Sequence, residues 1–233
     1  MTSPMLDIFV GYDHDEIVAY HTLCASLIER STLPIRFTPI NLANLQGVFQ
    51  RDRVPQQSTE FSFSRFLTPY LSGYTGWSLF MDCDMLARAD IAELFALKDE
   101  RYAVMVCRHD YTPRDTVKFL NNRQASYAKK NWSSLMLFNN DRCRALSSDF
   151  VNTASGLDLH QFVWLADEAL IGSLPLEWNW LVGEYPANPG ARIAHFTRGG
   201  PYFAGYETCD YADEWRAVQV RANSARQAPM SGT

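Results

Sequence analysis

Two aspartates separated by one residue, Asp82 and Asp84, are the side chains of this sequence best placed to do chemistry. They follow the apolar run Trp77–Met81, whose length and composition are typical of a buried strand. In an extended chain the two carboxylates lie on one side and Cys83 lies on the other. Such a pair suits Mg²⁺ or Mn²⁺ shared with the phosphates of a substrate. The alternative is that both aspartates simply begin a turn after the strand.

Alternating strand and helix patterns surround this pair and indicate how it would be positioned. Leu6–Val10 and Ile35–Ile40 are predicted strands, and residues 17–30 between them have the apolar spacing of a helix. This opening is typical of a βαβ unit and predicts a mostly parallel sheet. Further along we predict a polar loop over 41–59, helices over 61–71 and 91–97, strands over 102–107 and 133–138, and a mostly helical stretch over 141–172. Asp90 and Glu93 are placed to form a capping box for the helix over 91–97.

The chain as a whole predicts one folded domain of the α/β class. Its 233 residues are 47% hydrophobic and contain no visible repeat or linker. We therefore expect a single domain over residues 1–220, in which helices flank a mostly parallel sheet. The stretch after Pro175 is predicted to be irregular and aromatic, and the polar residues 221–233 are predicted to form a disordered tail.

Charge and cysteine content limit the partners and the location. The net charge of −5 argues against nucleic acid, although residues 101–144 hold nine Lys and Arg against three Asp. That local excess would either attract a phosphorylated or acidic ligand or form a solvated basic surface. Five cysteines without a Cys-x-x-Cys pair indicate reduced thiols in a cytoplasmic protein. No apolar stretch reaches the roughly 18 residues of a membrane span, and peripheral membrane contact is compatible with the sequence but not indicated.

Five stretches occur in a defined order between about Ile8 and Tyr202. They are Phe9–Asp13, Ser64–Leu71, Leu79–Phe95 with its Asp-x-Asp pair, the dipeptide Asp167-Glu168, and His195–Tyr202. In this order and spacing they resemble the GT-A nucleotide-sugar glycosyltransferases, in particular the retaining family 8 group that includes glycogenin and bacterial lipopolysaccharide galactosyl- and glucosyltransferases. The resemblance implies a Rossmann-like GT-A fold and an enzyme that uses Mn²⁺ or Mg²⁺ as cofactor.

The resemblance also implies roles for individual residues. The expected metal ligands are Asp82, Asp84 and His195, and the expected catalytic carboxylates are Asp167 and Glu168, which stand where the family usually has Asp-Gln. The nucleotide-sugar is expected to contact Gly11, Tyr12, Asp13, Arg65, Asp82 and Arg198. Each assignment has a simpler alternative, such as a helix cap for Asp13, a hydrogen-bonded histidine for His195 and structural carboxylates for the acidic dipeptide.

The chain departs from the family pattern at two places. Trp132-Ser133-Ser134 stands in the register of the family's Asn-Ser/Ala-Gly triplet, which helps to hold the sugar, so the identity of the donor sugar does not carry over. Gly200-Pro201-Tyr202 replaces the usual Lys-Pro-Trp, so the phosphate-binding lysine is missing and Arg198 is the candidate replacement. Trp132, Trp178, Trp180 and Tyr202 would offer flat surfaces to a sugar ring or, more simply, belong to the core.

The resulting hypothesis is a metal-dependent glycosyltransferase that moves a sugar from a nucleotide-diphosphate donor, expected to be UDP-linked, to a hydroxyl of a glycan or glycolipid with retention. One alternative is a non-catalytic nucleotide- or glycan-binding protein on the same scaffold, because a fold does not fix a function. A second alternative is a nucleotidyltransferase, but such enzymes normally carry a Gly-rich phosphate loop near the first strand. The single Gly11 argues against that loop.

Overall fold

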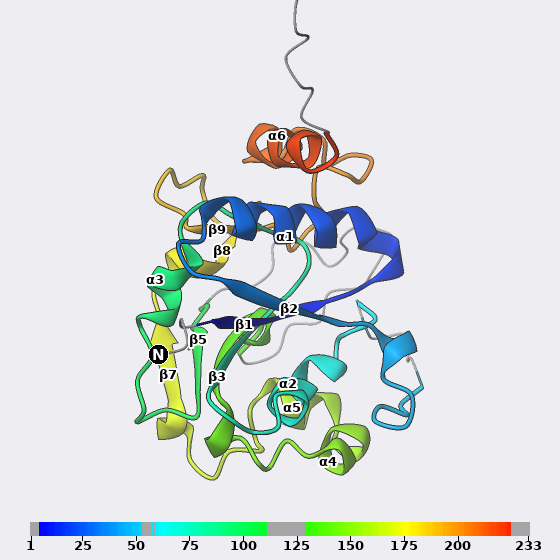
Figure 1. The fold of residues 1–233 in the computed structure, drawn as a ribbon, viewed down its shortest axis with the longest axis vertical. Coiled ribbons are helices and arrows are strands. Elements are labelled where there is room, and N and C mark those ends of the chain that lie inside the picture. Colours follow the sequence, from blue (N-terminus) through cyan, green and yellow to red (C-terminus); the bar gives the residue numbers. More distant parts are fainter. Residues whose placement is uncertain (1–4, 53–56, 58, 111–128, 225–233) are drawn as a thin grey trace, which may run out of the picture.

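A six-stranded sheet forms the centre of the molecule in a computed structural model that describes residues 5–52, 57, 59–110 and 129–224 (Figure 1). In spatial order its strands are β2 (Ile35–Ile40), β1 (Leu6–Gly11), β3 (Trp77–Met81), β6 (Leu135–Asn139), β5 (Val104–Cys107) and β7 (Ile171–Leu174). Strand β6 is antiparallel to β3 and β5, and the other neighbours pair in parallel. The prediction of a mostly parallel sheet is therefore confirmed.

Helices cover both faces of this sheet, which explains why its central strands β3, β6 and β5 are almost entirely apolar. Helix α1 (Ile17–Arg30) lies over one face, and α2 (Thr68–Leu71), α4 (Ser148–Thr153) and α5 (Gly156–His160) lie over the other (Figure 1). Every residue of β5 and β6 is buried. A strand that is buried on both faces has no need of alternating polar residues, so it is encoded as a continuous apolar run.

A second, smaller sheet lies beside the first and carries part of the candidate site. It consists of β4 (Met85–Ala87), β9 (Ile193–His195) and β8 (Trp180–Leu181) in that spatial order. Helix α6 (Ala212–Ala222) packs against α1 beyond this sheet (Figure 1). A separate apolar cluster joins the small sheet to α6, and its buried members are Leu86, Val182, Ala194, Phe196, Trp215 and Val218.

The structure corrects two sequence predictions in the C-terminal half. The stretch over 141–172 is not mostly helical, because α4 and α5 are short and Phe162 adopts a left-handed backbone (φ 60°) just after α5. Helix α6 was not predicted, since only Ala212, Trp215 and Val218 anchor it in an otherwise polar segment. The predicted boundary at residue 220 falls inside this helix, and residues 225–233 lie outside the described part of the chain.

The helix after the small-sheet strand β4 begins as predicted but is capped by one side chain only. Asp90 accepts a hydrogen bond from the backbone N–H of Ala92 (2.9 Å) and so caps α3 (Ile91–Phe95). Glu93 does not complete a capping box, because its carboxylate pairs with Arg192. Within the residues that the structure describes, no helix is both long and apolar enough to cross a membrane.

Candidate active site

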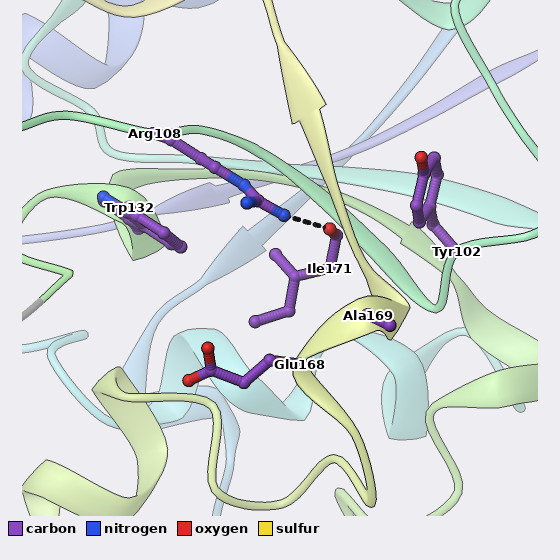
Figure 2. Close-up of a pocket in the computed structure, with 6 residues that line it drawn as sticks. All are labelled: Tyr102, Arg108, Trp132, Glu168, Ala169 and Ile171. Carbon is purple, nitrogen blue, oxygen red and sulfur yellow. Dashed lines mark hydrogen bonds between the residues drawn. The ribbon is translucent and has the colours of Figure 1, made fainter.

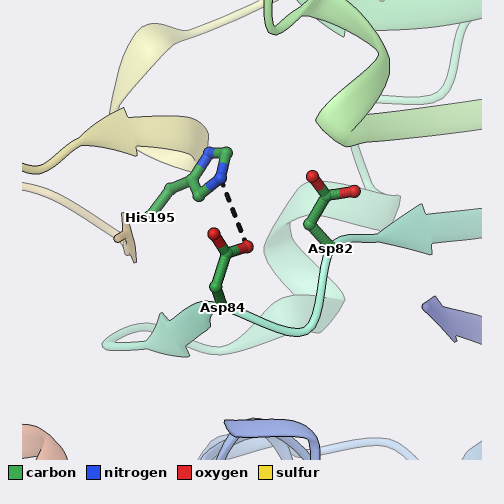
Figure 3. A group of neighbouring side chains, drawn as sticks. All are labelled: Asp82, Asp84 and His195. Carbon is green, nitrogen blue, oxygen red and sulfur yellow. Dashed lines mark ion pairs between the residues drawn. The ribbon is translucent and has the colours of Figure 1, made fainter. Parts of the chain in front are cut away.

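Asp82, Asp84 and His195 form a compact buried group at the carboxyl end of β3 (Figure 3). Each offers one ligand atom, and these atoms all lie within 4.8 Å of one another. Asp84 Oδ1 lies 3.3 Å from His195 Nε2, and the three residues are 8%, 7% and 1% exposed, respectively. Carboxylates withdrawn from water need compensating positive charge. The sequence thus predicted residues that the fold brings together.

The short strands of the second sheet explain how residues so distant in sequence meet. After β3 the chain bends at Cys83 and Asp84 and enters β4, whose Met85 pairs with His195 of β9. The N–H of Phe196 donates to the carbonyl of Asp84 (2.8 Å), and the N–H of Asp82 donates to the carbonyl of Ser134 (2.9 Å). The placement expected from the sequence assumed an extended chain through the aspartate pair, but the chain bends there. Both carboxylates still converge on the histidine.

Cys83, between the two aspartates, belongs to the core. Its side chain is completely buried, and burial raises the pKa of its thiol well above the usual range, with nearby carboxylates adding to the effect. A neutral, protonated thiol in this place is a small apolar filler and no metal ligand.

Arg65 lies inside the site and contacts a metal-ligand candidate. Its Nη1 lies 2.7 Å from Asp82 Oδ1 and donates to the carbonyl of Ser133 (3.0 Å). The guanidinium also lies 5.1 Å and 5.2 Å from the ring centroids of Phe61 and Phe80. Arg65 is only 5% exposed, so it is not an arginine of the solvated surface. The arginine supplies part of the positive charge that Asp82 needs and fixes where its carboxylate points.

A buried hydrogen-bond chain orients the ring of His195. Its Nδ1 lies 2.8 Å from Asn179 Oδ1, and Asn179 Nδ2 donates to Ser134 Oγ (2.8 Å), whose hydroxyl donates to the carbonyl of Asn131 (2.7 Å). Because that hydroxyl proton is already used, Ser134 Oγ accepts and the amide of Asn179 must present its oxygen to the histidine. Nδ1 then donates to Asn179, which leaves Nε2 facing Asp84 as the atom that can bind a metal ion. No pattern in the sequence marks Asn179.

Gly11 and Tyr12, expected at the nucleobase, have clear packing contacts. A Cβ on Gly11 would lie 2.4 Å from the ring of Phe61, so this position excludes any side chain. The ring of Tyr12 makes edge contacts with His14 and Tyr20 at centroid distances of 5.5 and 5.2 Å. These contacts give a rigid turn after β1.

Asp13, the third residue of that turn, takes the capping role that the sequence left open. Its Oδ1 accepts from the N–H of Asp15 and its Oδ2 from the N–H of Glu60, both at 2.9 Å. It thus caps the 3₁₀ helix His14–Glu16 and ties it to the segment before β3. Asp13 is 2% exposed, and burial raises the pKa of its carboxyl in spite of both hydrogen bonds.

The segment after β9 explains the missing lysine. A Cβ on Gly200 would lie 2.2 Å from the ring of Tyr202, so this ring fills the space that a side chain at position 200 would need. The hydroxyl of Tyr202 donates to Glu16 Oε2 (2.5 Å) beneath the site. Burial raises the pKa of that hydroxyl well above the usual range, and the Glu16 carboxylate adds to the rise. Arg198 is half-buried and reaches the carbonyl of Gly183 (3.4 Å).

Asp167 and Glu168 lie outside the aspartate–histidine group and are not on the predicted helix. Asp167 caps the 3₁₀ helix Glu168–Leu170, with Oδ1 accepting from the N–H of Ala169 (2.8 Å). Both carboxylates are exposed, and Glu168 pairs with Lys129. Glu168 also lines a cavity of about 340 Å³ (Figure 2). The full set of cavity-lining residues is Tyr102, Arg108, Trp132, Glu168, Ala169 and Ile171.

Glycosyltransferases of known structure share this fold. The bifunctional glycosyltransferase WbbM matches with a TM-score of 0.64 and 14% identity over 94% of this chain, which spans only 50% of that chain. GlyE of Streptococcus pneumoniae gives 0.61 and 14%, over 93% of this chain and 60% of its own. Galactosyltransferase LgtC in complex with donor and acceptor sugar analogs gives 0.56 and 12%, over 95% and 98%. The chain therefore has the GT-A glycosyltransferase fold, and it resembles the family 8 enzymes as the sequence motifs predicted.

A curated relative defines the family more closely. No model of a known protein family matches the chain. Protein CDI of Arabidopsis thaliana is 46% identical over 217 residues, which make up 89% of this chain and 83% of that protein. The chain belongs to the family of Protein CDI.

Proposed function

We propose that this protein is a metal-dependent glycosyltransferase that transfers a sugar from a nucleotide-diphosphate donor, preferentially a UDP-sugar, to a hydroxyl of a glycan or glycolipid with retention. One observation carries the proposal. Asp82, Asp84 and His195 lie buried within 4.8 Å of one another at the carboxyl end of β3 in a GT-A fold. Ligands of open α/β sheets bind at the carboxyl ends of the strands, which supports the placement of the donor there.

The three side chains fit a divalent cation. Two carboxylate oxygens and one unprotonated imidazole nitrogen suit Mn²⁺ at least as well as Mg²⁺. His195 Nε2 and Asp84 Oδ1 lie 3.3 Å apart, close enough for both atoms to ligate one cation. A metal ion bound by Asp82, Asp84 and His195 would supply positive charge to the diphosphate leaving group.

The surrounding residues position this group and complete the charge pattern. Arg65 holds the Asp82 carboxylate in place, and Asn179 holds the His195 ring in its metal-binding tautomer. Arg198 is the nearest substitute in sequence for the missing lysine, and a planar guanidinium suits a phosphate. We also propose that the turn formed by Gly11, Tyr12 and Asp13 contacts the nucleoside of the donor. The five cysteines are all free thiols, which supports a cytoplasmic location.

Nucleotide-sugar turnover by the purified protein tests the proposal. A panel of UDP- and other nucleotide-linked sugars is incubated with Mn²⁺, and released UDP and the sugar product are both measured. Asp84→Asn should abolish both signals, whereas the matched control Asp99→Asn, a partly exposed carboxylate paired with Arg101, should retain them. Turnover that persists after chelation of all metal would refute the mechanism. UDP binding without sugar release from any donor would favour the binding-protein alternative, and release of a sugar phosphate in place of UDP would favour nucleotidyl transfer.

A further inference from the structure

One short segment, Asn131–Ser134, connects the cavity beside Glu168 with the candidate metal centre. Trp132 lines the cavity, whereas Ser134 accepts hydrogen bonds from Asp82 N–H and from Asn179 Nδ2. Two residues of chain span at most about 7 Å, so the wall of the cavity and the scaffold of the metal centre are neighbours. A volume of about 340 Å³ lies at the lower end of the range typical of small-molecule sites, roughly 300–1,000 Å³.

The cavity wall is held in place by fixed contacts. The indole Nε1 of Trp132 donates to the carbonyl of His109 (3.0 Å), which immobilises the ring. Arg108 lies over that ring at 5.4 Å and donates to the carbonyl of Ile171 at the start of β7 (Figure 2). Lys129, whose backbone is left-handed (φ 62°), donates to the carbonyl of Gln161 (2.9 Å) and pairs with Glu168. Such backbone strain is commonly retained at functional sites.

Within the described residues, the charges of the lining leave one cation, Arg108, without a carboxylate partner. Glu168 is neutralised by its ion pair with Lys129. Arg108 has no carboxylate partner among the residues that the structure describes, and one of its five N–H donors is committed to Ile171. Both cations come from the basic stretch 101–144, whose excess charge the metal centre does not use. The lining therefore offers a planar donor, a carboxylate acceptor and apolar surface from Trp132 and Ile171.

We propose that this cavity is the acceptor subsite and that it binds a sugar carrying a negatively charged group, with Arg108 as the anchor of that charge. The inference rests on the proposed glycosyltransferase function, since it names the substrate class of the same site. A guanidinium fork binds a carboxylate or a phosphate through paired N–H donors. Glu168 accepts hydrogen bonds from sugar hydroxyls, and the faces of Trp132 and Ile171 cover the C–H face of the ring.

Direct binding of three monosaccharides tests this assignment. Glucuronate, glucose 6-phosphate and glucose are titrated into the protein with Mn²⁺ and UDP present, and affinities are measured by calorimetry or ligand-observed NMR. One or both charged sugars should bind about tenfold more tightly than glucose, and the two arms distinguish a carboxylate from a phosphate. This factor corresponds to one charge-assisted hydrogen bond at a partly exposed site.

Arginine variants connect the preference to the cavity. Arg108→Ala should reduce the affinity for the charged sugar to that for glucose and leave UDP affinity unchanged, while Arg108→Lys should retain part of the preference. Arg144→Ala is the matched control, because Arg144 lies over the ring of Tyr74 at 5.3 Å and does not line the cavity. It should change nothing.

Equal or absent binding of the three sugars would overturn the proposal, as would an equal effect of the Arg108 and Arg144 variants. A parallel loss of UDP affinity in Arg108→Ala would assign the cavity to the donor and also overturn it. Failure of the proposed function looks different. Binding of glucuronate or glucose 6-phosphate through Arg108 without turnover of any nucleotide-sugar would contradict the enzyme and leave the anionic-sugar site standing.

Discussion

Replacing Asn179 separates the part of this site that binds metal from the part that holds the fold together. Its side chain is completely buried and makes two short hydrogen bonds, one with His195 Nδ1 and one to Ser134 Oγ, besides a longer one to the carbonyl of Asn131 (3.5 Å). Asn179→Leu removes both bonds with little change in volume. Asn179→Asp keeps an acceptor for His195 but replaces the donor to Ser134 with a second acceptor.

The size of each effect follows from these two bonds. Leaving His195 Nδ1 and Ser134 Oγ without their buried partner costs about 1–3 kcal/mol for each group, so Asn179→Leu should lower the free energy of unfolding of the metal-free protein by about 2–6 kcal/mol. Loss of the hydrogen bond behind a ligating histidine typically weakens metal binding by about 10- to 100-fold. In Asn179→Asp the metal affinity should stay within a few-fold of the parent, because the Nδ1 proton still has an acceptor.

Two measurements distinguish these effects. Urea unfolding with a chelator present gives the metal-free stability, and Mn²⁺ titration followed by electron paramagnetic resonance gives the affinity of the folded protein. Ser134→Ala is the matched control, because it removes the partner of Asn179 Nδ2 without touching the imidazole. The reasoning would be refuted if Asn179→Leu lowered stability but bound Mn²⁺ as tightly as the parent, or if Leu and Asp weakened binding equally.

Three further outcomes are expected. Arg65→Met should destabilise the metal-free protein by about 3–5 kcal/mol, since it leaves the buried Asp82 without its ion-pair partner, and should increase the thermal stabilisation that Mn²⁺ gives; an unchanged metal response would contradict this. Gly200→Ala should cost about 1–3 kcal/mol in urea unfolding because its Cβ meets the Tyr202 ring, whereas Gly190→Ala, 3.3 Å from Asn188 Oδ1, should cost less. Burial lowers the pKa of His109 to about 3, so the neutral form is favoured in the fold, and the contribution of His109 to stability should be constant above about pH 6.5 and fall below it. Burial also lowers the pKa of His160 to about 3, so His109→Gln should flatten the fall in stability only in part.

Local sequence patterns predicted the parts of the site that lie on single elements. The apolar run before Asp82 and Asp84 could only be a buried strand, and Asp90 predicted the start of α3 correctly. The place of His195 beside Asp84 came from the resemblance to a family, because the pairing of Met85 with His195 joins residues more than 100 positions apart.

Contacts between distant segments account for what the sequence could not provide. Asn179 acts through Ser134, 45 positions away, and a lone asparagine beside Trp178 carries no pattern that reveals such a partner. The cavity depends on Arg108, Trp132 and Glu168 meeting from three separate segments. Helix α6 was not predicted because only Ala212, Trp215 and Val218 are buried in it. The other residues of the helix are mostly polar or charged, so the apolar periodicity of the segment is weak.

The register of two three-residue strands, β4 and β9, has a consequence for the integrity of the whole chain. A metal ion shared by Asp84 and His195 would be a reversible cross-link that closes a loop of more than 100 residues. By the loop-entropy argument used for disulfides, long loops gain most from such closure. Removal of the metal by a chelator should therefore allow the C-terminal third to unfold locally before the rest of the chain. Amide hydrogen exchange should then be faster in β9 and α6 than in β1 and β3. The metal ion would then stabilise the fold as well as take part in the reaction.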